Sequence, residues 1–447
     1  EFGDLRLESI TGNWYFSENE PDPIGVCWSK NSKATPEGWQ FVIEDELGLF
    51  EPGTRKTTEK MTLSIGAFQQ WEDFKSFAVS SSTVEMSEVC EENIFESENI
   101  IVNADSELSL LLKSFRNSYM DGQLRIAMDD KEIYQTVITP EEEKTSSELR
   151  IKSSEFDAIS VLKGEFRTNS MLTQIEELVL CPSNTEVTSQ SLSVDTFSVY
   201  VVNNGCITLK AAPDFYPGLF SINVNGVEWL DTSFPNVTAK SWWNPWAGGM
   251  KTSPSGLTTY SLMKEQNSAS PTEIRDSKGN MWSGLAVSTE MIEHPEWKGV
   301  HFVQYYLMLP GVPVIATYLE VKESAGKNLK HETWNTDLFI GNEVLTKIKM
   351  NVSGNTNQYT AGVQELPMHF EMGDYFTSSS KGDKFYLVPS LYNEHAEAYT
   401  NKHAFPVLLS QSAIPSENEM KTAPVFMVFD ERILTKNLLK KLRRIEF

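Results

Sequence analysis

Tryptophan is the residue type whose placement in this sequence most directly suggests a binding chemistry. The segment KSWWNPWAGGM, residues 240–250, is rich in tryptophan, and seven of the eleven tryptophans fall between residues 229 and 334. An indole offers a flat apolar face to the C–H side of a sugar ring and an N–H donor to a hydroxyl. We therefore predict that six tryptophans contact a ligand, namely Trp242, Trp243, Trp246, Trp282, Trp297 and Trp334.

Packing is the alternative role for any single tryptophan, because large β-sandwiches also use indoles to fill wide gaps between their sheets. Trp242 and Trp243 are adjacent, and adjacent side chains of an extended chain face opposite ways. We expect one tryptophan of the segment to be buried and another to face a ligand. Pro245 disfavours a helix in the preceding residue. Gly248-Gly249 permits a sharp turn or a close approach of the backbone to a ligand.

Several motifs for covalent, phosphate and metal chemistry are missing from the sequence, which contains no GxSxG, GxxxxGK[ST], GxGxxG or HExxH. The cysteines, Cys27, Cys90, Cys181 and Cys206, are far apart and form no CxxC pair. Buried free thiols are expected, and a Cys181–Cys206 disulfide is the alternative. We accordingly predict neither a metal site nor a cofactor.

The net charge of −24 narrows the class of partner. Nucleic-acid binding needs clustered lysine and arginine, so no nucleic-acid partner is expected. A neutral saccharide remains compatible with this charge. No apolar run approaches the ~18 residues that cross a bilayer, so no membrane span is predicted. The sequence starts EFGDLRLESI, without an initiator methionine, and we expect a neighbouring domain of a longer chain as a further partner.

Period-two alternation of apolar and polar residues dominates the sequence. In GQLRIAMDD, for example, Leu124, Ile126 and Met128 point to one side of a predicted strand. We predict a β-rich N-terminal region over residues 1–97, a β-sandwich over 98–190 and a larger sandwich over 195–430. The Ser- and Thr-rich stretch 182–193 is expected to be the linker between the two sandwiches.

The tail ERILTKNLLKKLRRIEF, residues 431–447, differs from the rest of the chain because its leucines fall at helical spacing and its other positions are largely basic. We predict an amphipathic helix that docks on the acidic body of the same protein. A helix that binds a membrane surface or a partner is the alternative.

Four segments after residue 195 follow a recognisable order. They are the strands with an Asn-Gly turn in 201–236, then WWNPWAGGM (242–250), VQYYLMLPGVPVIATYLEVKE (303–323) and HETWNTDLF (331–339). This order resembles the galactose-mutarotase-like β-supersandwich family. The preceding region, 98–190, resembles the jelly-roll sandwiches of carbohydrate-binding modules.

The resemblance implies a sugar ligand and a possible aldose epimerase chemistry. An epimerase of this type uses an imidazole acid and a carboxylate base on either side of the sugar ring. The positions that would correspond here are His331, His301 and Glu394. His331 departs from the family pattern because Lys330 precedes it and Glu332-Thr333-Trp334 follows it, so we assign no catalytic residue.

The sequence therefore predicts an all-β protein in which a jelly-roll-like β-sandwich precedes a large mutarotase-like supersandwich and a C-terminal amphipathic helix. The predicted function is carbohydrate recognition or scaffolding within a larger carbohydrate-related protein, without catalysis. An aldose 1-epimerase is one alternative, and a purely structural or protein-interaction module is the other, because one fold serves many functions.

Overall fold

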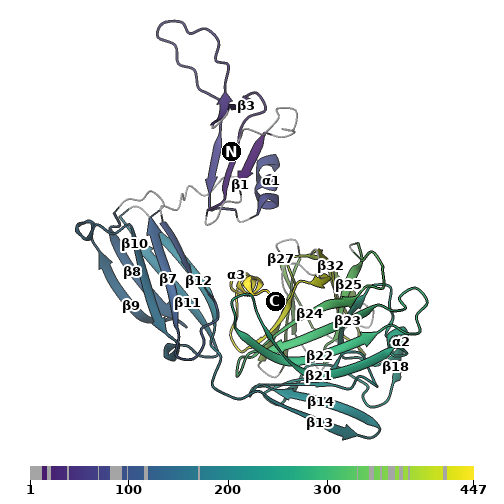
Figure 1. The fold of residues 1–447 in the computed structure, drawn as a ribbon. Helices are drawn as coiled ribbons and strands as arrows, with labels where there is room; N and C mark the ends of the chain where they lie inside the picture. Colours follow the sequence, from purple (N-terminus) through teal and green to yellow (C-terminus); the bar gives the residue numbers. More distant parts are fainter. Residues whose placement is uncertain are drawn as a thin grey trace. The chain divides into compact units, whose positions relative to one another are not determined.

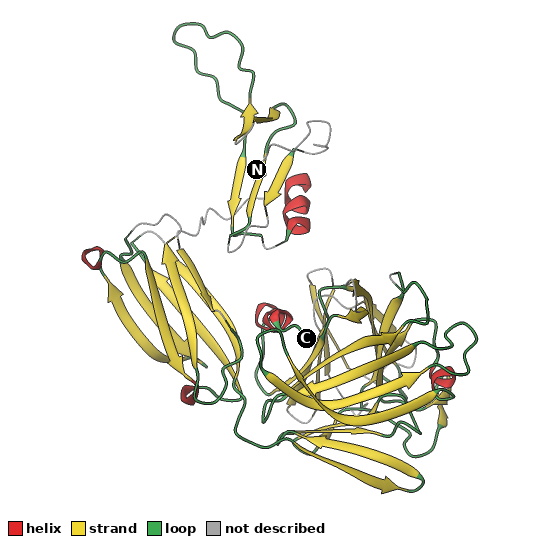
Figure 2. Ribbon diagram, viewed as in Figure 1, coloured by secondary structure: helices red, strands yellow, loops and turns green. Residues whose placement is uncertain are grey.

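Antiparallel strands make up most of the chain, as the sequence predicted (Figure 1, Figure 2). The computed structural model describes residues 13–17, 22–37, 40–68, 70–80, 93–97, 99–114, 119–169, 172–329, 331–341, 347–352, 355–360, 368–371, 376–380, 383–415 and 420–447. The chain divides into two compact units, residues 1–92 and residues 93–447.

The N-terminal unit is a small sheet packed against one helix. The sheet contains β1 (Trp14–Ser17), β2 (Ile24–Cys27) and β5 (Thr62–Ile65), and β3 (Lys33–Glu37) pairs with β4 (Gln40–Glu44) in a hairpin. Helix α1 (Trp71–Ser80) buries Phe74, whose ring lies 5.4 Å from that of Phe16. A Cβ at Gly25 would lie 2.5 Å from the Phe74 ring, so β2 accepts this ring because it carries glycine there.

A β-sandwich begins the second unit. One sheet has the order β10-β7-β6 and the other the order β12-β11-β8-β9. The strands are β6 (Asn93–Ser97), β7 (Glu107–Ser114), β8 (Gly122–Met128), β9 (Lys131–Ile138), β10 (Ser146–Lys152), β11 (Ile159–Arg167) and β12 (Leu172–Leu180), with single 3₁₀ turns at Pro140–Glu142 and Ser153–Glu155. Leu124, Ile126 and Met128 all point into the core between the sheets, which confirms the predicted alternation. The sandwich starts at Asn93, because β6 pairs with β7, whereas the sequence placed its start at residue 98.

Two larger sheets follow, and we call them sheet 1 and sheet 2. Sheet 1 contains β13 (Thr188–Val194), β14 (Phe197–Asn203), β15 (Ile207–Ala211), β16 (Leu219–Val224), β20 (Met250–Pro254), β25 (Thr333–Phe339), β32 (Pro406–Pro415), β31 (Asn393–Thr400) and β28 (Met368–Glu371). The short β17 (Val227–Glu228) pairs with β16, and β18 (Thr238–Lys240) pairs with β19 (Trp243–Trp246) in a separate hairpin.

Sheet 2 contains β21 (Gln266–Arg275), β22 (Met281–Glu290), β23 (His301–Met308), β24 (Val314–Glu323), β34 (Val425–Asp430), β30 (Asp383–Val388), β29 (Phe376–Ser380), β26 (Lys347–Val352) and β27 (Asn355–Thr360). The short helix α2 (Thr259–Leu262) precedes β21. The end of β32 pairs with β33 (Met420–Thr422), which also pairs with β24. Sheets 1 and 2 are therefore continuous through β32.

The predicted linker 182–193 contains most of strand β13. Every side chain of β13 is exposed, and the strand pairs with β14 along its whole length. An edge strand without buried side chains can be built from serine and threonine, so its composition resembles that of a loop. For this reason the sequence placed the start of the large sandwich at residue 195 instead of Thr188.

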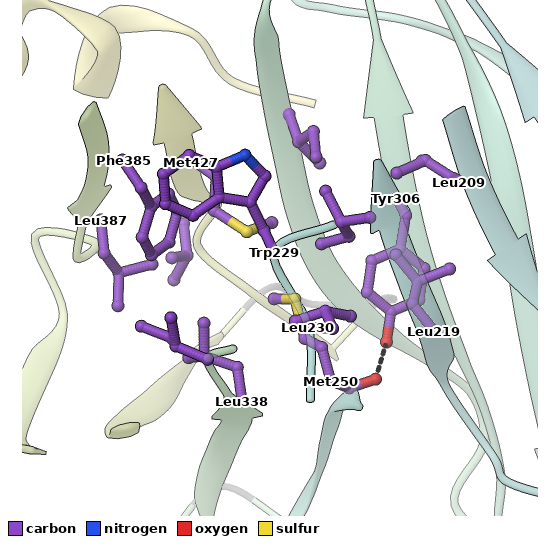
Figure 3. Close-up of a cluster of buried hydrophobic side chains, with 14 of the residues drawn as sticks. Leu209, Leu219, Trp229, Leu230, Met250, Tyr306, Leu338, Phe385, Leu387 and Met427 are labelled. Atoms are coloured by element: carbon purple, nitrogen blue, oxygen red, sulfur yellow. Dashed lines mark hydrogen bonds between the residues drawn. The ribbon is translucent and has the colours of Figure 1, made fainter. Parts of the chain in front are cut away.

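The main hydrophobic core lies between sheets 1 and 2 (Figure 3). Leu219, Met250 and Leu338 come from sheet 1, and they meet Tyr306 and Met427 of sheet 2. The Tyr306 hydroxyl lies 3.3 Å from the carbonyl oxygen of Met250, which joins the two sheets by a hydrogen bond inside this core.

The other face of sheet 2 is buried by the C-terminal segment and by the β-sandwich. Helix α3 (Lys436–Lys440) continues into a 3₁₀ turn over Lys441–Arg444. Its leucines share one buried cluster with side chains of β12, β23 and β24. Lys441 and Arg444 lie 2.9 Å and 3.2 Å from the buried Glu177 carboxylate of β12. The tail thus docks on its own protein, as predicted, with a shorter helix than the 431–447 expected.

The described cysteines are free, as expected, but only Cys27 is buried, whereas Cys181 and Cys206 are half-buried. Cys27, Cys181 and Cys206 are free thiols, and Cys90 lies outside the described residues. The alternative of a Cys181–Cys206 disulfide is therefore wrong. Burial raises the pKa of the Cys206 thiol to about 11, and the Asn204 side chain is its hydrogen-bond partner.

Leu442→Ala tests the docking of the tail. We expect it to lower the free energy of unfolding of the 93–447 unit by about 2–5 kcal/mol, because it opens a cavity in a buried cluster. Leu442 is 0% exposed, whereas Ile433 in the same segment is 76% exposed. Ile433→Ala is therefore the control, with an expected loss below about 0.5 kcal/mol. Urea unfolding monitored by tryptophan fluorescence measures both, and equal losses would contradict the docked arrangement.

Alkylation tests the environment of Cys206. Iodoacetamide reacts with thiolates, so we expect Cys206 in the folded protein to react slowly at neutral pH and faster as the pH approaches about 11. Mass spectrometry of peptides after timed labelling gives the rate. Urea-unfolded protein is the control, in which Cys206 should react as an ordinary thiol. Rapid labelling of the folded protein at neutral pH would rule out the buried environment.

Candidate functional site

A pocket of about 310 Å³ lies on the outer face of sheet 1, opposite the core that sheet 1 shares with sheet 2. Strands β20, β25, β31 and β32 supply most of its lining, and the β18–β19 hairpin supplies one wall. The lining residues are Tyr216, Trp242, Trp243, Lys251, Thr259, Asp337, Phe339, Glu397, Tyr399, Pro406, Val407 and Leu408.

Strand alternation decides which side chains reach the pocket. On β25, Leu338 enters the core while Asp337 and Phe339 line the pocket. On β31, Ala398 enters the core while Glu397 and Tyr399 line the pocket. Because successive side chains of a strand point to opposite faces, the apolar residues that build the core also place the polar and aromatic residues outside.

The strand register places four pocket residues in one row. Lys251 of β20 is paired with Asp337 of β25, Asp337 with Leu408 of β32, and Leu408 with Glu397 of β31. Neighbouring strands lie ~4.8 Å apart. The row therefore carries one cation, one carboxylate, one apolar side chain and a second carboxylate in lateral order.

Lys251 and Asp337 form an ion pair at the base of the pocket. The Lys251 ammonium lies 2.5 Å from Oδ2 of Asp337 and 3.2 Å from the Ser253 hydroxyl. The Lys251 side chain is 4% exposed and that of Asp337 is 34% exposed. The ammonium is thus shielded from water while the carboxylate reaches the pocket.

Aromatic side chains form the wall above this row. The Trp242 indole N–H donates to the Tyr399 hydroxyl at 2.6 Å, and the Asn401 amide also donates to that hydroxyl, at 3.0 Å. Trp243 packs edge to face on Phe339 and Tyr399, with ring centroids 5.3 Å and 5.9 Å apart. Trp242 remains 66% exposed, so these contacts orient its ring and still leave it open to a ligand.

The segment 240–250 is shaped by its own backbone packing. A Cβ at Gly248 would lie 2.1 Å from the Asp231 carbonyl oxygen, and one at Gly249 would lie 2.4 Å from that of Leu219. Both glycines also have positive φ angles, of 75° and 76°. The glycine pair therefore allows close approach to neighbouring backbone, and this contact accounts for it without a ligand.

Tyr216 is a buried residue of the pocket lining. Burial raises the pKa of its hydroxyl well above the ordinary value, and the negative charge of Asp337 acts in the same direction. Tyr216 thus remains protonated and is suited to hydrogen bonding instead of acting as a base.

The structure separates the six predicted ligand-contacting tryptophans into two groups. Trp242 and Trp243 line the pocket. The other four are buried in packing roles, so they offer no face on which a ligand could stack, and we assign them to the core: Trp246, Trp282, Trp297 and Trp334. Large apolar side chains stabilise the interior most when fully buried, which explains their placement.

The three positions considered for an epimerase do not line the pocket. His331 and Glu394 are exposed, and His301 lies on β23 of sheet 2, where its Nε2 atom is 2.6 Å from the Ser288 hydroxyl. Among the described lining residues there is no histidine. Over the described part of the chain, no three His, Cys, Asp or Glu side chains gather as a metal site requires.

Sequence reasoning missed Lys251, Asp337, Glu397 and Tyr399. They belong to no short motif, and the register that joins them pairs strands far apart in the chain. A usable signal was one charged residue in each of two strands, Lys251 in β20 and Asp337 in β25, because a charged residue within a sheet needs a partner or a polar ligand.

The sequence matches no protein-family model, and no curated protein resembles it significantly. The described residues include no helix that is both long enough and apolar enough to cross a membrane.

Two substitutions test the ion pair. Asp337→Asn leaves a shielded ammonium without its carboxylate, and we expect a loss of about 3 kcal/mol in the free energy of unfolding. Lys251→Met leaves the carboxylate, which water reaches, and keeps an apolar stem, so a loss below about 1 kcal/mol is expected. Denaturant unfolding measures both. Similar losses for the two variants would contradict the difference in shielding.

Proposed function

We propose that the pocket on sheet 1 binds a saccharide without catalysing a reaction. The observation that carries the proposal is the aromatic wall of Trp242 and Trp243 beside a carboxylate oriented by Lys251. An indole packs against the apolar face of a sugar ring, while fixed polar groups bond its hydroxyls.

The dimensions and polar groups of the pocket support a small ligand. Its volume of about 310 Å³ is at the lower end of the ~300–1,000 Å³ found for ligand pockets. Asp337 accepts hydrogen bonds from hydroxyls, and Thr259 can donate or accept. A mono- or disaccharide satisfies both the apolar wall and these polar groups.

For this pocket we favour non-catalytic saccharide binding over an aldose epimerase reaction. The galactose-mutarotase-like resemblance remains a proposal about family, and it agrees with two stacked sheets of which one carries a ligand pocket. An epimerase of that type would place an imidazole beside the ring, but no histidine is among the described lining residues.

A scaffolding role for the same unit is supported by a separate observation. The β-sandwich, sheet 2 and the C-terminal segment share one buried cluster. Such a shared core would hold the pocket in a constant position relative to the β-sandwich, which suits a module that presents a ligand to a neighbouring domain.

Binding is tested by screening a panel of mono- and disaccharides by tryptophan fluorescence and measuring hits by calorimetry. We expect Trp242→Ala and Trp243→Ala each to raise the dissociation constant about tenfold, which corresponds to a loss of ~1.4 kcal/mol in binding free energy. Trp71→Ala is the matched control, because Trp71 is an exposed tryptophan of the N-terminal unit. Absence of binding by every saccharide, or equal loss in all three variants, would refute the proposal.

A further inference from the structure

The tip of the β18–β19 hairpin is bound to sheet 1 by the side chain of Asn401, which follows β31. The Asn401 amide nitrogen donates to the Ser241 hydroxyl oxygen at 2.9 Å and to the Tyr399 hydroxyl oxygen at 3.0 Å. Asn401 is buried, and neither Asn401 nor Ser241 is among the lining residues of the pocket. The hairpin that carries Trp242 is therefore tied to sheet 1 by a residue that lies outside the pocket lining.

We propose that Asn401 is a positioning residue for saccharide binding. It holds the Ser241-Trp242 turn against sheet 1, so that the Trp242 indole is already oriented before a sugar enters the pocket. Ordering a side chain during binding costs free energy, and a site whose aromatic wall is ordered in advance avoids that cost. This inference rests on the proposed saccharide function and adds to it a residue that determines affinity without touching the sugar.

The loop between β31 and β32 fixes the orientation of the Asn401 amide. Its Oδ1 atom accepts hydrogen bonds from the backbone N–H groups of His403 at 2.8 Å and Ala404 at 2.9 Å. Because the oxygen faces these two donors, the amide nitrogen must face the hairpin. Ala404 and the following Phe405 are fully buried. Asn401 therefore extends toward the hairpin from a loop that is anchored in the core.

The turn at the tip of the hairpin has a backbone conformation that usually belongs to glycine. Lys240 pairs with Trp243, so Ser241 and Trp242 are the two central residues of a tight turn. The φ angle of Ser241 is 53°, in the left-handed region that disfavours residues with a Cβ. A serine in this place supplies a hydroxyl that accepts the hydrogen bond from Asn401, which a glycine could not do.

The same amide acts on the Trp242 ring through Tyr399. The Tyr399 hydroxyl oxygen accepts one hydrogen bond from the Trp242 indole N–H, at 2.6 Å, and another from the Asn401 amide. The turn thus holds the backbone of Trp242, and Tyr399 holds its indole. Since most of the Trp242 side chain is exposed, packing contributes little to its orientation, and these hydrogen bonds contribute much of it.

Release of the turn is measured without a sugar, from the ¹⁵N relaxation of the Trp242 backbone amide in the full chain. Ser241→Ala removes one hydrogen bond at an exposed position, and Asn401→Ala removes the bonds to both Ser241 and Tyr399. We expect the order parameter of the Trp242 amide to fall from about 0.85 to below about 0.6 in both variants. Lys402→Ala, at an exposed residue of the same loop, is the matched control and should keep the parent value.

Calorimetry with glucose, galactose, maltose and cellobiose compares the affinities of the same proteins. For each sugar that the parent binds, we expect Ser241→Ala to raise the dissociation constant about threefold and Asn401→Ala about tenfold, with no further loss in the double variant. Lys402→Ala should bind as the parent does.

Thermal unfolding checks that each variant folds, and Ser241→Ala decides the outcome if Asn401→Ala does not fold. An ordered Trp242 amide or the parent's affinity in Ser241→Ala would overturn the positioning role and leave the proposed function standing. Absence of binding by every saccharide to the parent protein would overturn both.

Discussion

The candidate site depends on the two-residue alternation of β20, β25, β31 and β32. These strands bury one face against sheet 2. The free energy gained by burying their apolar side chains determines which residues point outward. A shift of one residue in any of them would exchange the two faces. Lys251, Asp337 and Glu397 therefore lie in one row because Met250, Leu338 and Ala398 lie in the core.

The two sheets differ in what covers their outer faces. Sheet 2 is covered by the C-terminal segment and the β-sandwich, and the buried Glu177 pairs with two basic residues of that segment. Sheet 1 carries the pocket and the β18–β19 hairpin on its outer face. The C-terminal segment thus helps to bury the outer face of sheet 2, while the outer face of sheet 1 carries the pocket.

Local patterns allowed the strands, the two sandwiches and the docked tail to be predicted, since alternation and helical spacing act over a few residues. The pocket row was not predictable, because pairing of Lys251 with Asp337 depends on strands far apart in sequence. The tryptophan cluster was predicted in part. Trp246 is buried, as expected of one tryptophan in the segment, and Trp242 is exposed. The burial of Trp282 and Trp334 depends on tertiary packing that composition does not reveal.

The most direct test of a ligand pocket on sheet 1 is a titration of the indole ¹H–¹⁵N resonances of the tryptophans with a saccharide that the fluorescence screen identifies. We expect the resonances of Trp242 and Trp243 to shift together in a saturable manner, while those of the buried Trp282 and Trp334 do not move. Assignment by single substitutions identifies each resonance. Unchanged Trp242 and Trp243 resonances at saturating sugar, or equal shifts of the buried indoles, would contradict a ligand pocket on sheet 1.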